Sequence, residues 1–195
     1  MSYKIHANPD TVLKNFVSID PGLYTFSFRI EYRTRKRIRT IAMWKLNLKK
    51  FTEYTLSELN SKFNEYHKQI SKCDTFIIES QLYIAKTAYI RIFQHSISYF
   101  MLKYPKMCIV EVNSKLKGNV FGWNKKRLKQ ESIKTGWELL EERGDTKGLE
   151  ILQNYQDLFD AETDKKKKNI YKLDDPTDTI CQIEALVRLL DEQEV

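Results

Sequence analysis

The sequence predicts an α/β protein in which a mixed β-sheet carries helices on its faces. Aromatic and polar residues alternate over 24–32, and a similar pattern recurs over 37–48, which is typical of strands with one buried face. From Leu56 the apolar residues recur every three or four positions, which indicates an amphipathic helix. Short apolar strands and helices then alternate, and this order favours a mixed sheet with helices packed against it.

The individual elements follow from local patterns. The apolar run at 16–19 ends at Asp20-Pro21-Gly22, where Pro-Gly indicates a tight turn, so this run completes an opening of three antiparallel strands. Pro176 suits the first turn of the last helix, because its missing N–H is not needed there. The later elements are expected to be a helix over 56–70, a strand over 76–79, a helix over 84–102, a strand over 107–112, helices over about 125–143 and 147–160, a polar linker over 164–169, and a helix over about 176–192. The result is a five-stranded sheet in a single domain over 1–195.

Composition narrows the classes of function. The 195 residues contain 33 Lys and Arg against 26 Asp and Glu, a net charge of +7, so a polyanion is the first partner to consider. The many aromatic residues exclude disorder as the main state, and no apolar run approaches the roughly 18 residues that span a bilayer. The first residues carry no signal-peptide core, and the three cysteines are far apart and form no zinc motif. We expect reduced thiols in an intracellular protein.

Acidic residues stand where an α/β sheet collects ligands. Asp20 and Glu79 each end an apolar strand, and Asp174, Asp175 and Asp178 open the last helix. If that helix packs on the sheet, four carboxylates converge, and such a cluster requires cations such as Mg²⁺. Each residue also has a structural interpretation: a turn aspartate, a surface glutamate or a helix cap. Taken together, the set favours a site for two metal ions that hydrolyses phosphodiesters.

These segments resemble the motifs of RuvC-type Holliday junction resolvases, which are ribonuclease H-like nucleases. Val17-Ser18-Ile19-Asp20-Pro21-Gly22 resembles the first motif, Ile77-Ile78-Glu79-Ser80-Gln81 the second, and Asp175-Pro176-Thr177-Asp178 the last. Within that group the sequence is most similar to the poxvirus resolvases. The segments at 111–119 and 172–175 support this likeness, which extends over about residues 15 to 190.

The resemblance implies a Mg²⁺-dependent endodeoxyribonuclease of ribonuclease H-like fold, in which Mn²⁺ can substitute. It would act as a homodimer that resolves four-way DNA junctions by symmetric paired nicks, in viral recombination, repair and resolution of replicated concatemers. The expected location is the host cytoplasm, and neither a membrane nor a small-molecule cofactor is expected. The implied metal ligands are Asp20, Glu79, Asp175 and Asp178, with Asp174 as the rival of Asp175, and Lys117, or next Lys115, would act near the scissile phosphate.

Basic and aromatic residues predict where DNA binds. A first basic run covers 33–39, where Arg35 and Arg37 would contact phosphates or merely protect a sheet edge. Tyr83 matches an aromatic residue that stacks on a junction base in bacterial relatives, or it packs on its own helix. Phe121 and Trp123 are expected to anchor the turn at Gly122 rather than to face DNA. A denser basic cluster is predicted to bind DNA phosphates: Lys115, Lys117, Lys125, Lys126, Arg127 and Lys129.

Other interpretations remain open at this point. The excess of apolar residues over 84–102 suits a helix that packs on the sheet and on a dimer partner, or a helix buried within one subunit. The lysine run 165–168 would contact DNA or only improve solubility. The fold could also serve a broader branched-DNA nuclease, a nuclease of RNA–DNA hybrids, or a basic DNA-binding module without catalysis.

Overall fold

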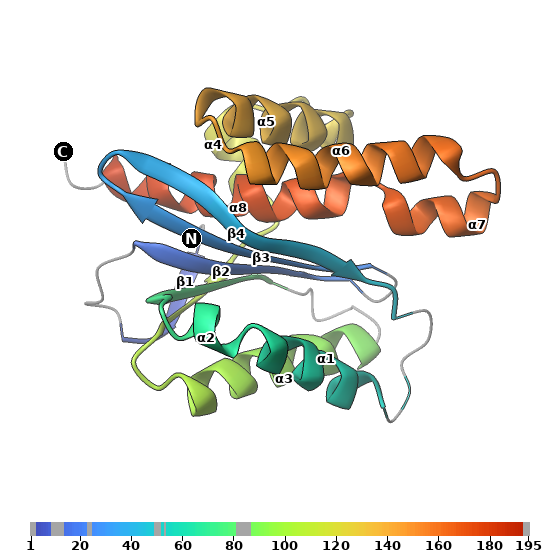
Figure 1. The fold of residues 1–195 in the computed structure, drawn as a ribbon. Coiled ribbons are helices and arrows are strands. Elements are labelled where there is room, and N and C mark those ends of the chain that lie inside the picture. The colour runs from blue at the N-terminus through green and yellow to red at the C-terminus, as the bar shows by residue number, and fades with distance from the viewer. Residues whose placement is uncertain are drawn as a thin grey trace.

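The structure, a computed structural model, describes residues 3–8, 14–22, 25–48, 52, 54–80 and 87–192. A mixed sheet lies at its centre, and Figure 1 shows this sheet between two layers of helices. The strand order is β1-β6-β5-β2-β3-β4. The strands are β1 (Tyr3–Ala7), β2 (Asn15–Pro21), β3 (Phe26–Thr34), β4 (Arg37–Leu46), β5 (Thr75–Glu79) and β6 (Cys108–Val112).

The predicted fold class is confirmed, but the expected number of strands is wrong. The sheet has six strands, because β1 pairs in antiparallel fashion with β6, with Tyr3 beside Val112 and Ile5 beside Val110. The other pairings follow the prediction: β2, β3 and β4 are antiparallel, and β5 and β6 run parallel to β2. A five-residue edge strand whose partner lies far along the chain leaves little local pattern in the sequence.

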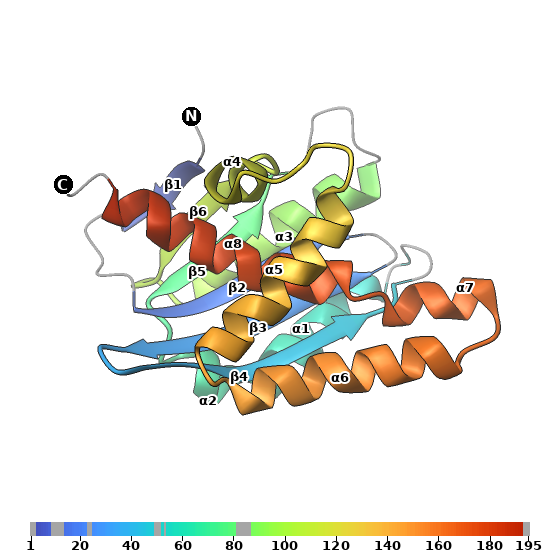
Figure 2. The same ribbon diagram turned by 90° about the horizontal axis from the view of Figure 1, so that it is seen from above.

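Helices cover both faces of the sheet, as Figures 1 and 2 show. One face carries α1 (Thr55–Glu65), α2 (His67–Ile70) and α3 (Thr87–Lys103). The other face carries α4 (Leu116–Phe121), α5 (Leu128–Glu142), α6 (Thr146–Ala161), α7 (Lys165–Lys168), the short helix η1 (Asn169–Tyr171) and α8 (Asp174–Asp191). In Figure 2 α8 crosses the sheet, α5 crosses over α8, and α6 lies along β4. None of the helices within the described ranges could span a bilayer.

Several predicted helix boundaries differ from the structure. The helix expected over 56–70 is two helices, and the expected polar linker over 164–169 contains α7 and the first residue of η1. The last helix begins at Asp174, two residues before the position expected from Pro176, so both residues of the aspartate pair lie in its first turn. Helix α4 was not predicted, because its six residues are too few to establish a helical period.

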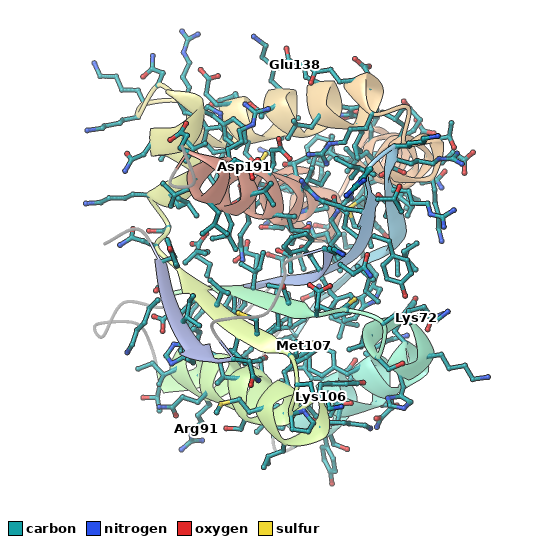
Figure 3. All side chains as sticks on the ribbon, turned by 90° about the vertical axis from the view of Figure 1, so that its left-hand side faces the viewer. Lys72, Arg91, Lys106, Met107, Glu138 and Asp191 are labelled. Carbon is teal, nitrogen blue, oxygen red and sulfur yellow. The ribbon has the colours of Figure 1, made fainter. Side chains whose placement is uncertain are left out.

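The two faces of the sheet differ in what they bury. Against α1 and α3 lies an apolar and aromatic core, in which Phe76 stacks on Phe100 with ring centroids 4.0 Å apart. Against α8 the sheet buries apolar residues near β5 and β6, but also the charged side chains of Arg29 and Glu31. Figure 3 shows the side chains that fill both interfaces, with Glu138 of α5 on one side of the sheet and Lys106 on the other.

Helix α8 is held unusually close to its neighbours. It packs against β2, β3 and α5, and most of its residues up to Leu186 are buried. Its contact with α5 is so close that a Cβ atom at Gly136 would lie only 2.7 Å from two carbon atoms of the Thr177 side chain. The start of α8 is therefore fixed over the sheet, and this start carries the aspartates.

Candidate active site

One row of residues runs across the sheet where β2 ends. The antiparallel register places Asp20 beside Ser27 and Ser27 beside Lys45. Ile19 lies beside Ile78 in the parallel pairing, so Glu79 is the next residue of β5 alongside Asp20. Neighbours in one row point to the same face of a sheet. Lys45, Asp20 and Glu79 therefore extend toward the layer that contains α8.

Lys117 joins this row to α8. Its Nζ lies 2.8 Å from Glu79 Oε2 and 3.1 Å from Asp178 Oδ2, and the residue is only 5% exposed. Burial by itself would lower the pKa of Lys117, but the charges of Asp178, Glu79 and Asp20 raise it well above its ordinary value. The lysine is therefore protonated at neutral pH, and one cation holds carboxylates from β5 and α8 together.

Asp20 carries more negative charge around it than this lysine neutralises. Burial, and then the charges of Glu79 and Asp178, raise the pKa of Asp20 well above its ordinary value, although Lys117 opposes the shift. Asp175 raises this pKa further. The four carboxylates predicted as a site thus act on one another, and their charges are only partly balanced by the protein.

The structure distinguishes the two residues of the aspartate pair. Asp175 Oδ2 lies 2.7 Å from Nζ of Lys45, and the same Nζ donates a hydrogen bond to the carbonyl of Lys172. Asp174 Oδ2 lies 2.6 Å from Nζ of Lys129, whose side chain is 74% exposed. Asp175 is thus bound by a lysine of the sheet, in the row that contains Asp20. Asp174 instead pairs with a solvent-exposed lysine of α5.

Two residues of this site were missed by sequence reasoning. The alternating pattern of the sequence places Lys45 in a strand but assigns it no role. Only the register of β3 and β4 reveals that it lies in the row of Asp20. Ser132 of α5 donates a 2.5 Å hydrogen bond to Asp178 Oδ1, and it gives no sequence signal because serine is common in helices. Counting the hairpin pairing outward from its turn would place Trp44 rather than Lys45 beside Ser27, because the register shifts between Ile30 and Glu31. Neither Lys45 nor Ser132 could therefore have been found from the sequence.

In the described ranges, no three histidine, cysteine, aspartate or glutamate side chains form a group that could hold a metal ion. Lysine ammonium groups contact the carboxylates instead: Lys117 contacts Glu79 and Asp178, and Lys45 contacts Asp175. All the acidic groups offer hard oxygen donors, the type that Mg²⁺ and Mn²⁺ prefer. The chemistry of this donor set and its unbalanced negative charge fit a divalent cation.

Much of the predicted basic cluster surrounds a pocket beside the carboxylates. The pocket has a volume of about 610 Å³, and its lining includes Lys115, Lys117, Lys125 and Lys129. Lys126 and Arg127 are exposed in the turn that precedes α5. Four lysines of the cluster therefore line the same pocket as Glu79 and Asp178.

The other predicted DNA contacts lie apart from the carboxylates. Arg35 and Arg37 are at the tip of the hairpin of β3 and β4, about 23 Å along the strand from Ser27 at roughly 3.3 Å per residue. Arg33, which the sequence places in the same basic run, is not a free surface cation: its side chain is 12% exposed and pairs with Glu31 and Glu184. Tyr83 lies outside the described residues.

A double-mutant cycle should measure how Lys45 holds its aspartate. We expect Lys45→Met to lower the free energy of unfolding by about 1–3 kcal/mol, because it leaves a partly buried carboxylate without its cation. In the Asp175→Asn background the loss should shrink by at least about 0.5 kcal/mol, and in the Asp174→Asn background it should not. Urea unfolding measures the wild type, the three single variants and the two double variants. Lys129→Met is the exposed control, and a Lys45 coupling to Asp174 instead would contradict the assignment.

The structure can now be compared with known proteins. No family model matches the sequence, and no curated protein matches it significantly. Among solved structures, the fowlpox virus resolvase in complex with its substrate Holliday junction DNA has a TM-score of 0.63 at 17% identity, over 90% of this chain and 98% of that one. RuvC of Thermus thermophilus has a TM-score of 0.54 at 7% identity, over 90% and 96% of the two chains.

The yeast mitochondrial Holliday junction resolvase gives a TM-score of 0.57 at 12% identity, over 91% of this chain and 80% of that one. Each of the three neighbours therefore aligns with this chain over most of the length of both proteins. The sequence identities are low, so the likeness shows the fold alone. The chain has the fold of the RuvC-type resolvases, and the family resemblance seen in the sequence is confirmed at that level.

Proposed function

We propose that this protein is an endodeoxyribonuclease that resolves four-way DNA junctions. The observation that carries the proposal is that Glu79 and Asp178 both contact the buried Lys117 beside Asp20, at the strand ends of a resolvase fold. Asp175, held by Lys45 of the same row, adds a fourth carboxylate whose charge acts on Asp20. Clustered carboxylates beside a positively charged pocket match phosphodiester hydrolysis better than simple DNA binding. A binding module has no use for acidic groups that repel the phosphates.

Asp20, Glu79, Asp175 and Asp178 would hold Mg²⁺, with two ions in each site by the family resemblance and Mn²⁺ as a substitute. When bound, the metal ions supply an activated water and Lewis-acid stabilisation of the charge on the phosphate. The charges that raise the pKa of Asp20 support this assignment, because a divalent cation is what relieves the repulsion.

The chain's own groups have defined roles in this proposal. Lys117 keeps a proton on its ammonium group at neutral pH, so it can donate a hydrogen bond to the reacting phosphate or a proton to the leaving oxygen. Lys45, which lies on the sheet, positions Asp175, and Ser132, which lies on α5, fixes one oxygen of Asp178. The exposed lysines around the pocket, Lys115, Lys125 and Lys129, bind the phosphates on either side of the cut.

A junction resolvase needs two sites, because it cuts two opposed strands. A second copy of this chain, related by a twofold axis, would provide them. Helix α3 offers an apolar surface for such an interface, since Met101 and Leu102 are 42% and 84% exposed on it. The assembly would act on recombination intermediates and replicated concatemers of a viral genome in the cytoplasm of the host.

The experiment that tests this function is a strand-resolved cleavage assay on a four-way junction. We expect paired nicks at symmetric positions in Mg²⁺ or Mn²⁺, none in excess chelator, and weak activity on linear duplex. Flaps and RNA–DNA hybrids in the same assay separate a resolvase from a broader nuclease. Junction binding without cutting in any divalent metal would overturn the proposal and leave a binding module.

A further inference from the structure

The pocket beside the carboxylates has walls that phosphate binding does not explain. Its lining contains Glu79 and Asp178 together with Gly118, Trp123 and Leu128. Leu128 is 46% exposed, and most of the pocket surface is apolar. A volume of about 610 Å³ lies within the roughly 300–1,000 Å³ of ordinary small-molecule sites. A groove that only follows a phosphate backbone would have no need of a large apolar recess.

The aromatic wall of this pocket is held in one orientation. The indole Nε1 of Trp123 donates a 3.0 Å hydrogen bond to Thr135 Oγ1 on α5. Its ring stacks on Phe121 with centroids 5.5 Å apart and an interplanar angle of 16°. The Arg188 guanidinium lies 5.1 Å from the centroid of Phe121. A ring fixed from several sides is a preorganised stacking surface, so a flat ligand loses little by ordering it.

The charges around the pocket select the kind of ligand. Lys115, Lys125 and Lys129 bring positive charge to the lining, while most of the pocket surface is apolar. A ligand that joins an anion to a flat, weakly polar ring matches both the lysines and the apolar surface. A nucleotide within a DNA strand has this chemistry. Because Glu79 and Asp178 line the same pocket, the reacting phosphate would lie next to that nucleotide.

We infer that this pocket receives one unstacked nucleobase of the DNA, adjacent to the phosphate that is cut; the inference rests on the proposed junction nuclease. Bases that have lost stacking partners, as at a strand crossover, cost least to extrude. Stacking on an aromatic ring tolerates any base, but Asn119 also lines the pocket, and its amide can hydrogen-bond a base edge. The pocket would therefore decide which position of a junction is cut.

The test removes the base and the ring separately and together. Four-way junctions carrying a single abasic site at each position near the cut are titrated by fluorescence anisotropy against the Asp20→Asn protein, which binds without cutting. At one position we expect the abasic site to weaken binding about tenfold, the size expected for one stacked base. Adding Trp123→Ala to the Asp20→Asn protein should weaken binding of the intact junction about tenfold. In that double variant, the abasic site at the sensitive position should no longer weaken binding further. Trp123→Phe, which keeps an aromatic ring, should retain most of the affinity for the intact junction.

Several controls make the outcome decisive. Tyr54→Ala removes an aromatic residue that is 71% exposed on α1's side of the sheet, and it should change nothing. Circular dichroism and melting curves verify that Trp123→Ala is folded, and Leu128→Ser provides a second variant of the same wall. The inference is overturned if no abasic position matters, or if Trp123→Ala weakens intact and abasic junctions equally. Failure of the parent protein to prefer junctions over duplex would instead overturn the proposed function.

Discussion

Asp20→Asn is expected to abolish junction cutting while raising the melting temperature of the metal-free protein. The first effect follows because Asp20 is the central carboxylate of the cluster, and we expect the rate to fall about 10³-fold or more. The second follows because a neutral amide at this position no longer repels Glu79 and Asp178. For a protein of this size, each kcal/mol of relieved repulsion corresponds to about 2–4 °C.

The dependence of this gain on pH has a definite sign. The pKa of Asp20 is raised in the folded state, so the unfolded chain gives up its proton at lower pH than the folded protein does. Below the pKa of an unfolded-state aspartate, about 3.9, Asp20 is protonated in both states and the folded protein keeps its full stability. As pH rises through the raised pKa of Asp20 in the folded state, the carboxylate ionises and this stability is lost. The difference in melting temperature between Asp20→Asn and wild type should therefore widen from acid to neutral pH.

Differential scanning calorimetry in chelator measures the stability, and the strand-resolved assay measures cutting. Glu79→Gln should also stop cutting, because it removes a second carboxylate of the cluster. Asp160→Asn on the exposed side of α6 is the matched control, and it should alter neither property. An Asp20→Asn protein that still nicks junctions in Mg²⁺ would show that the site is assigned wrongly.

Glu31→Gln should produce the second large effect, a loss of about 3–5 kcal/mol in the free energy of unfolding. Glu31 is completely buried, and its carboxylate lies 2.7 Å from Arg29, 2.6 Å from Arg33 and 3.3 Å from Arg143. Removing its charge leaves a fully buried Arg29 and two nearly buried arginines with too few anions. Urea denaturation measures the loss.

The pH dependence provides an independent check. Burial opposes ionisation of Glu31, but Arg29, Arg33 and Arg143 outweigh it and lower its pKa to about 2. A carboxylate with a lowered folded pKa stabilises the protein above its unfolded pKa of about 4.3. That contribution is lost as pH falls toward 2, so wild type should lose stability over this range more steeply than Glu31→Gln.

An exposed ion pair supplies the control for this variant. Glu65 forms a 2.8 Å pair with Lys62 on the surface of α1, and both side chains are more than one-third exposed. Such pairs contribute about 0–1 kcal/mol, so Glu65→Gln should have little effect. If Glu31→Gln changes stability no more than Glu65→Gln does, the buried network contributes nothing to the fold.

The sequence predicted the parts of this structure that depend on local pattern. Alternation identified β3 and β4, the run ending at Asp20 identified β2, and the helical period identified α1, α3 and α8. Edge strand β1 was missed because its signal is its pairing with β6, which lies distant in the chain. Two of the predicted carboxylates, Glu79 and Asp178, share a contact with Lys117, and strand ends and helix starts such as theirs can be placed from sequence.

The basic residues could not be sorted by sequence alone. A run such as 33–39 looks uniform, yet Arg33 lies on β3 and enters a buried ion network, whereas Arg35 lies in the hairpin turn and Arg37 begins β4, and both of these are exposed. Which face an arginine takes depends on the anions that other elements bring to it, here Glu184 of α8. The role of Lys45 was hidden for the same reason, because its partner Asp175 comes from α8, far along the chain.

Helix α8 carries the last carboxylates at its start and Glu184 further along, where Arg33 and Arg143 bind it. The first carboxylate, Asp20, comes instead from the strand near the other end of the chain. During synthesis on the ribosome, the sheet therefore emerges long before the helix that completes the site. The nascent chain would therefore lack Asp175 and Asp178 until α8 has been released, so the carboxylate site would be completed only after the sheet has formed.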